Sequence, residues 1–128
     1  MNKIWFIALF IMSCEHQSST YNEGKKTYSI HCEHCHMKDG KGFEELYPPL
    51  ANSDALTTLE ARIACIIRNG IDGEMTVNGK VYNMAMPENK TLNAIEITNV
   101  INYINNSWGN ELGFTSLESI KRNLQECK

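Results

Sequence analysis

Aromatic residues, clusters of basic residues and sequence repeats are all scarce in this chain of 128 residues. Aromatic residues make up only 9%, so the polypeptide alone buries a modest core and a large apolar cofactor would help it to fold. The lysines and arginines are scattered and the formal net charge is −3, which argues against a nucleic-acid partner. Without repeats or low-complexity tracts, we expect one small domain preceded by a targeting segment.

The N-terminal segment has the pattern of an export signal. Lys3 is followed by an apolar run, residues 4–12, that is too short to span a bilayer as a helix. Residues 11–14, Ile-Met-Ser-Cys, resemble the cleavage box of bacterial lipoproteins, in which a small residue precedes the Cys that becomes lipid-modified. We therefore expect a signal peptide over residues 1–13. Cys14 would be the lipidated N-terminus, and residues 14–21 a short polar tether to a bacterial membrane on its periplasmic side. An ordinary signal peptide, with Cys14 incidental, is the alternative.

Helical periodicity predicts an all-α fold, with the domain over residues 22–128. Four predicted helices share an apolar stripe and a capping residue: Asn22 to Cys35, Thr57 to Gly70, Asn93 to about Trp108, and Thr115 to about Leu124. Glu60 and Glu96 would complete capping boxes with Thr57 and Asn93. The stretch from Gly70 to Pro87 has no helical period, so a long and functional loop is expected there.

The chemistry of the chain is concentrated in residues 31–36, His-Cys-Glu-His-Cys-His. Cys32, Cys35 and His36 form a C-x-x-C-H motif, whose two cysteines can attach one haem through thioether bonds while the histidine ligates its iron. A zinc site would need further ligands, and neither a second CxxC nor an H-x3-H pair follows. A redox dithiol would need a βαβ pattern, and a structural disulfide would leave His36 without a role. His31 and His34 are expected to face solvent.

The motifs around this hexapeptide resemble those of class I cytochromes c, the small bacterial monohaem type. The matching segments are spaced along most of the chain: Gly24, Tyr28 and the CxxCH, Asp39-Gly40-x-Gly42, Tyr47 to Ala51, Val77 to Asn83 with Met86-Pro87, and Tyr103 to Asn110. The resemblance implies the small cytochrome c fold, with about four short helices around one haem c that is bound covalently through Cys32 and Cys35. It also implies iron ligation by His36 and by a methionine of the long loop.

Three methionines of that loop compete for the role of second iron ligand. Met86 is followed by Pro87, which stiffens the backbone beside it, and it stands at the Met-Pro position of the family. We therefore expect Met86 rather than Met84 or Met75, which would pack against the cofactor or the core.

The resemblance assigns weaker expectations to four further residues. The Pro49 carbonyl is expected to accept a hydrogen bond from His36 Nδ1. Tyr47, Arg68 and Trp108 are candidates for lining the haem or pairing a propionate, although Arg68 equally fits a solvated cation at a helix end.

A haem iron ligated by both histidine and methionine has no free coordination position for a substrate, so electron transfer rather than catalysis is expected. The partners would be redox proteins that dock transiently, together with the membrane through the lipid anchor, and no small-molecule substrate. A haem-based sensor and a fixed subunit of a reductase, oxidase or dehydrogenase complex remain the alternatives. Cys65 and Cys127 either form a disulfide or stay free, and the sequence does not decide between the two.

Overall fold

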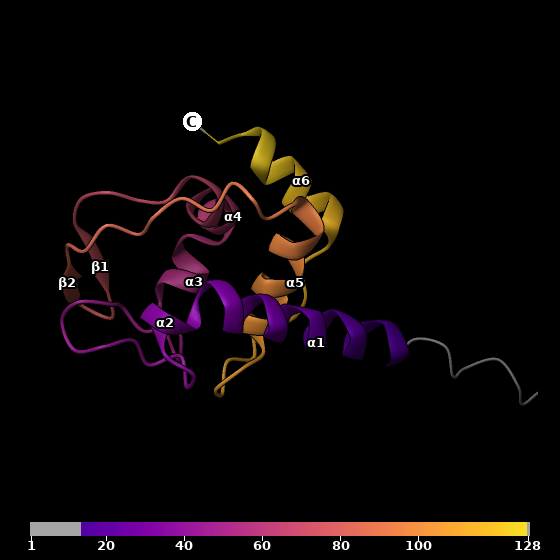
Figure 1. Ribbon diagram of the computed structural model, residues 1–128, viewed down its shortest axis with the longest axis horizontal. Coiled ribbons are helices and arrows are strands. Elements are labelled where there is room, and N and C mark those ends of the chain that lie inside the picture. The colour runs from indigo at the N-terminus through magenta and orange to yellow at the C-terminus, as the bar shows by residue number, and fades with distance from the viewer. Residues whose placement is uncertain (1–13, 128) are drawn as a thin grey trace, which may run out of the picture.

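The computed structural model describes residues 14–127, which form a helical domain with one small hairpin (Figure 1). In chain order the elements are α1 (Cys14–His31), α2 (Glu33–His36), α3 (Ala55–Thr58), α4 (Glu60–Asn69), β1 (Met75–Val77), β2 (Lys80–Tyr82), α5 (Ala94–Asn105) and α6 (Leu117–Gln125). Within the described residues no helix is long and apolar enough to cross a bilayer. The predicted signal peptide, residues 1–13, lies outside the described residues.

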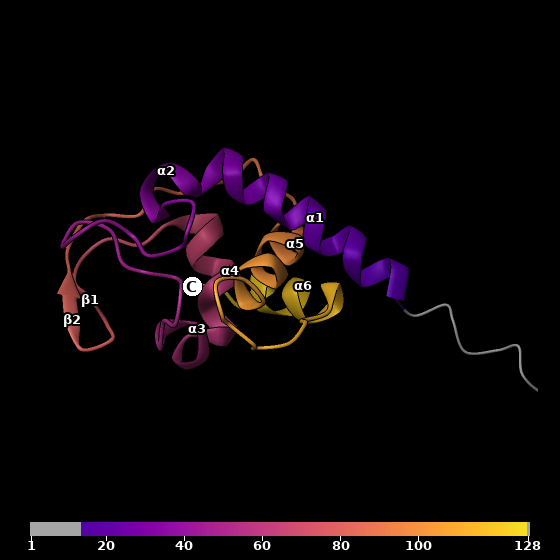
Figure 2. The ribbon, with the colours of Figure 1, turned by 90° about the horizontal axis from the view of Figure 1, so that it is seen from below.

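The core forms where α1 crosses α5. Gly24 makes this close approach possible, because a Cβ atom there would lie 2.0 Å from the carbonyl oxygen of Asn99 and 2.7 Å from the Cβ of Tyr103. Tyr28 is almost fully buried beside Tyr103, with their ring centroids 5.3 Å apart. Figure 2 shows α1 lying across α5, with its C-terminal end and α2 toward the hairpin. The packing of these two helices therefore fixes where the end of α1 lies.

Helix α5 is the element that the sequence predicts best. Asn93 Oδ1 accepts hydrogen bonds from the backbone N–H groups of Ile95 and Glu96, and the Glu96 carboxylate accepts one from the N–H of Asn93. The predicted capping box is thus confirmed. The apolar stripe is also confirmed, since Ile97, Val100 and Ile101 are buried in the core.

The boundaries of the first helix were predicted incorrectly. Helix α1 begins at Cys14, so residues 14–21, expected as a short polar tether, are helical, and Asn22 lies inside the helix rather than at its cap. The helix also ends at His31, because the backbone turns at Cys32, and Cys35 belongs to the short α2.

The predicted second helix is interrupted, and the predicted cap of the last helix is displaced. Leu59 leaves helical geometry between α3 and α4, and the Thr57 hydroxyl donates to the Asp54 carbonyl, so no Thr57–Glu60 capping box forms. Gly70 does end α4, with a φ of 72°. Helix α6 is capped by Ser116, whose hydroxyl accepts from Ser119 N–H, and not by Thr115.

The predicted long loop contains the β1–β2 hairpin. The strands pair in an antiparallel register, with Met75 opposite Tyr82 and Val77 opposite Lys80. Asn78 and Gly79 form the turn with positive φ angles of 50° and 77°, as a two-residue hairpin turn requires. An Asn-Gly pair between apolar runs is a hairpin signal, and it could have identified these strands from the sequence.

The segment just after α6 is joined to α4 by a disulfide between Cys65 and Cys127, with the two Cα atoms 5.5 Å apart. This answers the question that the sequence left open. Ile120, buried in the core, and Leu124, packed against it, complete the contact.

Replacing Gly24 with alanine should destabilise the protein. Helix propensity alone predicts a gain of about 1 kcal/mol for Gly→Ala inside a helix, but the added Cβ would overlap α5, and overpacking costs about 2 kcal/mol or more. We expect the net free energy of unfolding to fall in urea titrations followed by circular dichroism. The exposed neighbour Asn22→Ala is the control and should be neutral or slightly stabilising. A more stable Gly24→Ala protein would contradict the close packing.

Removing the disulfide with Cys65→Ala and Cys127→Ala should lower the free energy of unfolding by about 4 kcal/mol. The bond closes a loop with a sequence separation of 62, and the loss reflects the greater chain entropy of the unfolded state. Urea unfolding of the oxidised wild type, the reduced wild type and the double variant measures it. If all three proteins unfolded at the same urea concentration, the bond would contribute nothing.

Candidate functional site

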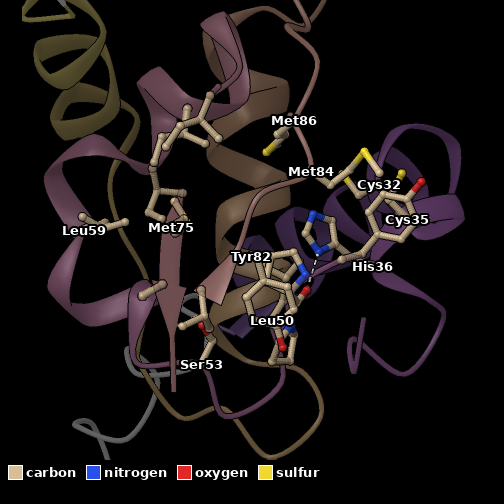
Figure 3. Close-up of a pocket in the computed structure, with 18 of the residues that line it drawn as sticks. Cys32, Cys35, His36, Leu50, Ser53, Leu59, Met75, Tyr82, Met84 and Met86 are labelled. Carbon is tan, nitrogen blue, oxygen red and sulfur yellow. Dashed lines mark hydrogen bonds between the residues drawn. The ribbon is translucent and has the colours of Figure 1, made fainter. Parts of the chain in front are cut away.

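A deep apolar cavity lies between the CxxCH segment and the loop that follows α4 (Figure 3). Its space, counted with the open mouth, is about 1040 Å³. One wall comes from Cys32, Cys35 and His36, and the facing walls come from α4 and residues 71–87. The lining is mainly aliphatic, so the cavity suits a large apolar group.

Both thiols of the CxxCH motif line this cavity. Helical turns hold them there, since the N–H groups of Cys35 and His36 both donate to the Cys32 carbonyl, at 3.2 and 2.9 Å. Neither thiol is in a disulfide. Burial, with a smaller contribution from Cys35, raises the pKa of Cys32 to about 12. A thiol that resists ionisation is a poor redox nucleophile, because that role needs the thiolate.

Metal binding by the polar side chains alone finds no support in the part of the chain that the structure describes. Within residues 14–127, no three His, Cys, Asp or Glu side chains are grouped closely enough to hold a metal ion. The zinc alternative therefore has no ligand set there.

The imidazole of His36 is oriented by a backbone carbonyl. Its Nδ1–H donates to the oxygen of Pro48 at 2.9 Å, drawn as the dashed line in Figure 3. The prediction of Pro49 as the acceptor is wrong by one residue: Pro49 lines the cavity instead. Because Nδ1 carries the proton, the lone pair of the neutral ring is on Nε2. Burial lowers the pKa of His36, against the opposing effect of the Pro48 hydrogen bond, and so favours the neutral, ligating form.

The loop after His36 is built to bring Pro48 back to the imidazole. The N–H of Gly42 donates to the His36 carbonyl at 3.1 Å, and a Cβ on Gly42 would lie 2.1 Å from the carbonyl oxygen of Tyr47. The hydroxyl of Tyr28 donates to the Met37 carbonyl at 2.6 Å and ties this loop to α1. The predicted Gly-rich turn is thus the element that places the acceptor of the histidine hydrogen bond.

The three candidate methionines all line the cavity, but their surroundings differ. Met86 is partly buried, packs against the core cluster, and exchanges two backbone hydrogen bonds with Ile71, at 3.0 and 2.9 Å. Met84 is 47% exposed. Figure 3 shows the Met86 side chain and the His36 ring projecting into the same space from different segments. Met75 also has a paired backbone, opposite Tyr82 in the β1–β2 hairpin, so the feature that distinguishes Met86 is its packing against the core cluster.

Of the remaining predicted residues, Tyr47 lines the cavity, whereas Arg68 and Trp108 do not. The Trp108 indole packs against Tyr28, with ring centroids 5.0 Å apart, and its Nε1–H donates to the Lys38 carbonyl. The Arg68 guanidinium turns toward the Leu92 carbonyl, 3.4 Å away. Both side chains support neighbouring backbone, and pairing of either with a propionate stays a prediction.

The two other histidines of residues 31–36 differ from one another. His34 is exposed, as expected. His31, also expected to face solvent, is partly buried, and its Nδ1 accepts a hydrogen bond from Asn89 Nδ2 at 3.1 Å.

The residues that line the cavity fit a haem. Two thiols, an imidazole with an available Nε2 and a thioether are the donor set for covalent attachment and axial ligation of haem c. The cavity is otherwise apolar, and the hydroxyl of Ser53 on its wall is buried without a hydrogen-bond partner among the described residues. No sequence pattern marks Ser53, which was missed as a polar group of the site.

Comparison with known proteins also indicates a haem protein of the cytochrome c type. The family model for cytochrome c matches residues 21–108. Cytochrome c-552 of Thermus thermophilus is 32% identical over 68% of this chain and 69% of that protein. The cytochrome c subunits of quinone alcohol dehydrogenase from Gluconacetobacter polyoxogenes and Gluconobacter oxydans are 34% and 32% identical, over 69% and 79% of this chain.

The chain therefore belongs to the cytochrome c family, and its cofactor is haem c, attached through cysteines. It spans only about a fifth of the length of the two dehydrogenase subunits, 19% and 22%. Helix α6 and Cys127 lie beyond the segment that the family model matches.

Proposed function

We propose that the protein is a monohaem electron carrier that exchanges one electron at a time with redox proteins. The observation that carries this proposal is the placement of His36 and Met86 on one cavity whose wall also holds both CxxCH thiols. Haem iron ligated by histidine and methionine changes between ferrous and ferric states at a raised potential.

The roles of the chain's own residues follow from their contacts. Cys32 and Cys35 would anchor the cofactor, and the Pro48 carbonyl keeps the proton of His36 on Nδ1 so that Nε2 is free to ligate. The backbone hydrogen bonds between Met86 and Ile71 hold the thioether side of the cavity. Apolar walls exclude water from the ligating atoms, which favours retention of the soft sulfur ligand.

Occupation of both axial positions leaves no site for a substrate, so we propose a carrier and not an enzyme. Two arrangements fit this chemistry. A free shuttle would dock weakly and leave quickly. A fixed subunit of a dehydrogenase complex is favoured by the likeness to the cytochrome c subunits of quinone alcohol dehydrogenases.

We also propose that Cys14 is lipid-modified and that acyl chains hold the domain on the periplasmic side of a bacterial membrane. The support is the sequence Ile-Met-Ser-Cys at residues 11–14 after a short apolar run. Lipid chains would supply membrane attachment without a spanning helix.

Replacing Met86 with alanine should open the iron to external ligands. In the wild type we expect the charge-transfer band from methionine sulfur to ferric iron, and no binding of carbon monoxide to the ferrous protein. Met86→Ala should lose the band and bind both cyanide and carbon monoxide. Met84→Ala is the matched control, because Met84 lines the same cavity but is 47% exposed, and it should keep the band. A wild type that binds carbon monoxide avidly would refute the carrier and favour a sensor.

Replacing Cys14 with serine should release the protein from the membrane. We expect the wild type to fractionate with membranes after a high-salt wash. The intact mass of its mature chain should correspond to a chain that begins at Cys14 and carries lipid. Cys14→Ser should appear in the soluble exported fraction with an unchanged haem spectrum. A wild-type mature chain without added lipid mass would disprove the anchor while leaving the carrier function untouched.

A further inference from the structure

The segment that follows Met86 is fastened to the end of α4. The backbone N–H of Asn89 is shared between the carbonyls of Ile67 and Arg68, at 3.1 and 3.2 Å. The Arg68 guanidinium donates to the carbonyl of Leu92, whose side chain is only 4% exposed. These contacts fix the backbone of residues 89–92 on the side of α4.

The Asn89 side chain connects this segment to a different element. Its Nδ2–H donates to His31 Nδ1 at 3.1 Å, and its Oδ1 accepts from the Thr91 hydroxyl at 2.8 Å. With Oδ1 facing the Thr91 hydroxyl, the Nδ2–H end of the amide faces His31. Asn89 is thus bonded through both its backbone and its side chain, and its two ends join α4 to α1.

The position of His31 gives this bond its significance. His31 is the last residue of α1 and is bonded covalently to Cys32, which lines the cavity. Asn89 stands three residues after Met86, which lines the same cavity. The hydrogen bond therefore joins two cavity-lining segments that are 58 residues apart in the sequence.

We propose that His31 and Asn89 are a positioning pair that holds the Met86 segment against the CxxCH end of α1. With the pair intact, the Met86 backbone cannot move away from the cavity without also breaking a partly buried hydrogen bond. The pair thereby keeps the thioether in place against competing ligands. This inference rests on Met86 being the sulfur ligand of the proposed function.

The test uses cyanide binding to the ferric protein as a measure of how readily Met86 is displaced. Asn89→Ala and His31→Ala should each raise the apparent affinity for cyanide about fivefold, since a net hydrogen bond of ordinary strength is lost. The double variant should bind cyanide no more tightly than either single variant, because both remove the same bond. His31→Asn should keep wild-type cyanide affinity. Asparagine Oδ1 lies where histidine Nδ1 does relative to the Cγ atom, so it can accept the hydrogen bond from Asn89 Nδ2.

Asn83→Ala is the matched control. Asn83 stands three residues before Met86, is exposed, and neither lines the cavity nor makes a side-chain hydrogen bond within the described residues. Its cyanide affinity should equal that of the wild type. Amide hydrogen exchange supplies a second readout: Asn89→Ala should speed exchange of the Met86 N–H, which donates to Ile71, and leave exchange of the α5 core amides unchanged.

The outcomes separate this inference from the function on which it rests. A wild type without the sulfur charge-transfer band would show that the proposed ligation fails. If the band is present but Asn89→Ala and His31→Ala bind cyanide like the wild type, the positioning pair is refuted and the carrier stands. Additive effects in the double variant, or failure of His31→Asn to keep wild-type affinity, would also overturn the pair.

Discussion

The close approach of α1 to α5 at Gly24 is the constraint on which the rest of the site depends. Without a side chain at this position, the backbone of α1 comes close enough to Asn99 and Tyr103 for the aromatic rings of the two helices to pack. That crossing sets the direction in which α1 ends, and Cys32, Cys35 and His36 follow immediately after that end. The location of His36 thus depends on this helix packing, and the Pro48 carbonyl then orients its ring.

The opposite side of the cavity is held by a different means. Residues 71–92 contain one short hairpin. Their backbone is held by the two hydrogen bonds between Ile71 and Met86 within the segment, and by those from the Asn89 N–H to the carbonyls of Ile67 and Arg68 at the end of α4. Gly70 allows the chain to pass there, since a Cβ would lie 2.4 Å from the Met86 carbonyl. A loop held through backbone atoms tolerates many side chains, which is consistent with three methionines in one segment, of which Met86 is the one that packs against the core cluster.

Sequence reasoning succeeded where the signal is local and chemical. The CxxCH motif, the Asn93–Glu96 capping box and the Gly70 helix end each rest on residues a few positions apart whose geometry is nearly fixed by covalent structure. It failed at the equally local Thr57–Glu60 pair, where Leu59 interrupts the helix, and where the outcome depends on distant packing. The acceptor of the His36 hydrogen bond is Pro48 and not Pro49, because the choice between two adjacent carbonyls depends on the path of the whole turn after Gly42.

The same distinction applies to the contacts of the larger side chains. Trp108 and Arg68 were expected at the cofactor because aromatic and cationic residues suit such contacts, yet their partners are Tyr28, the Lys38 carbonyl and the Leu92 carbonyl. A sequence shows which side chain is able to interact, but not which of its neighbours it meets.

The apolar core and the cavity wall are built from different parts of the chain. Buried residues from α1, α4 and α5 form one cluster, and Trp108 packs against it. The segments 38–53 and 71–87 instead contribute mainly to the cavity wall. A chain with so few aromatic residues therefore uses its core to place one side of the site, and it depends on the group bound in the cavity to complete the other.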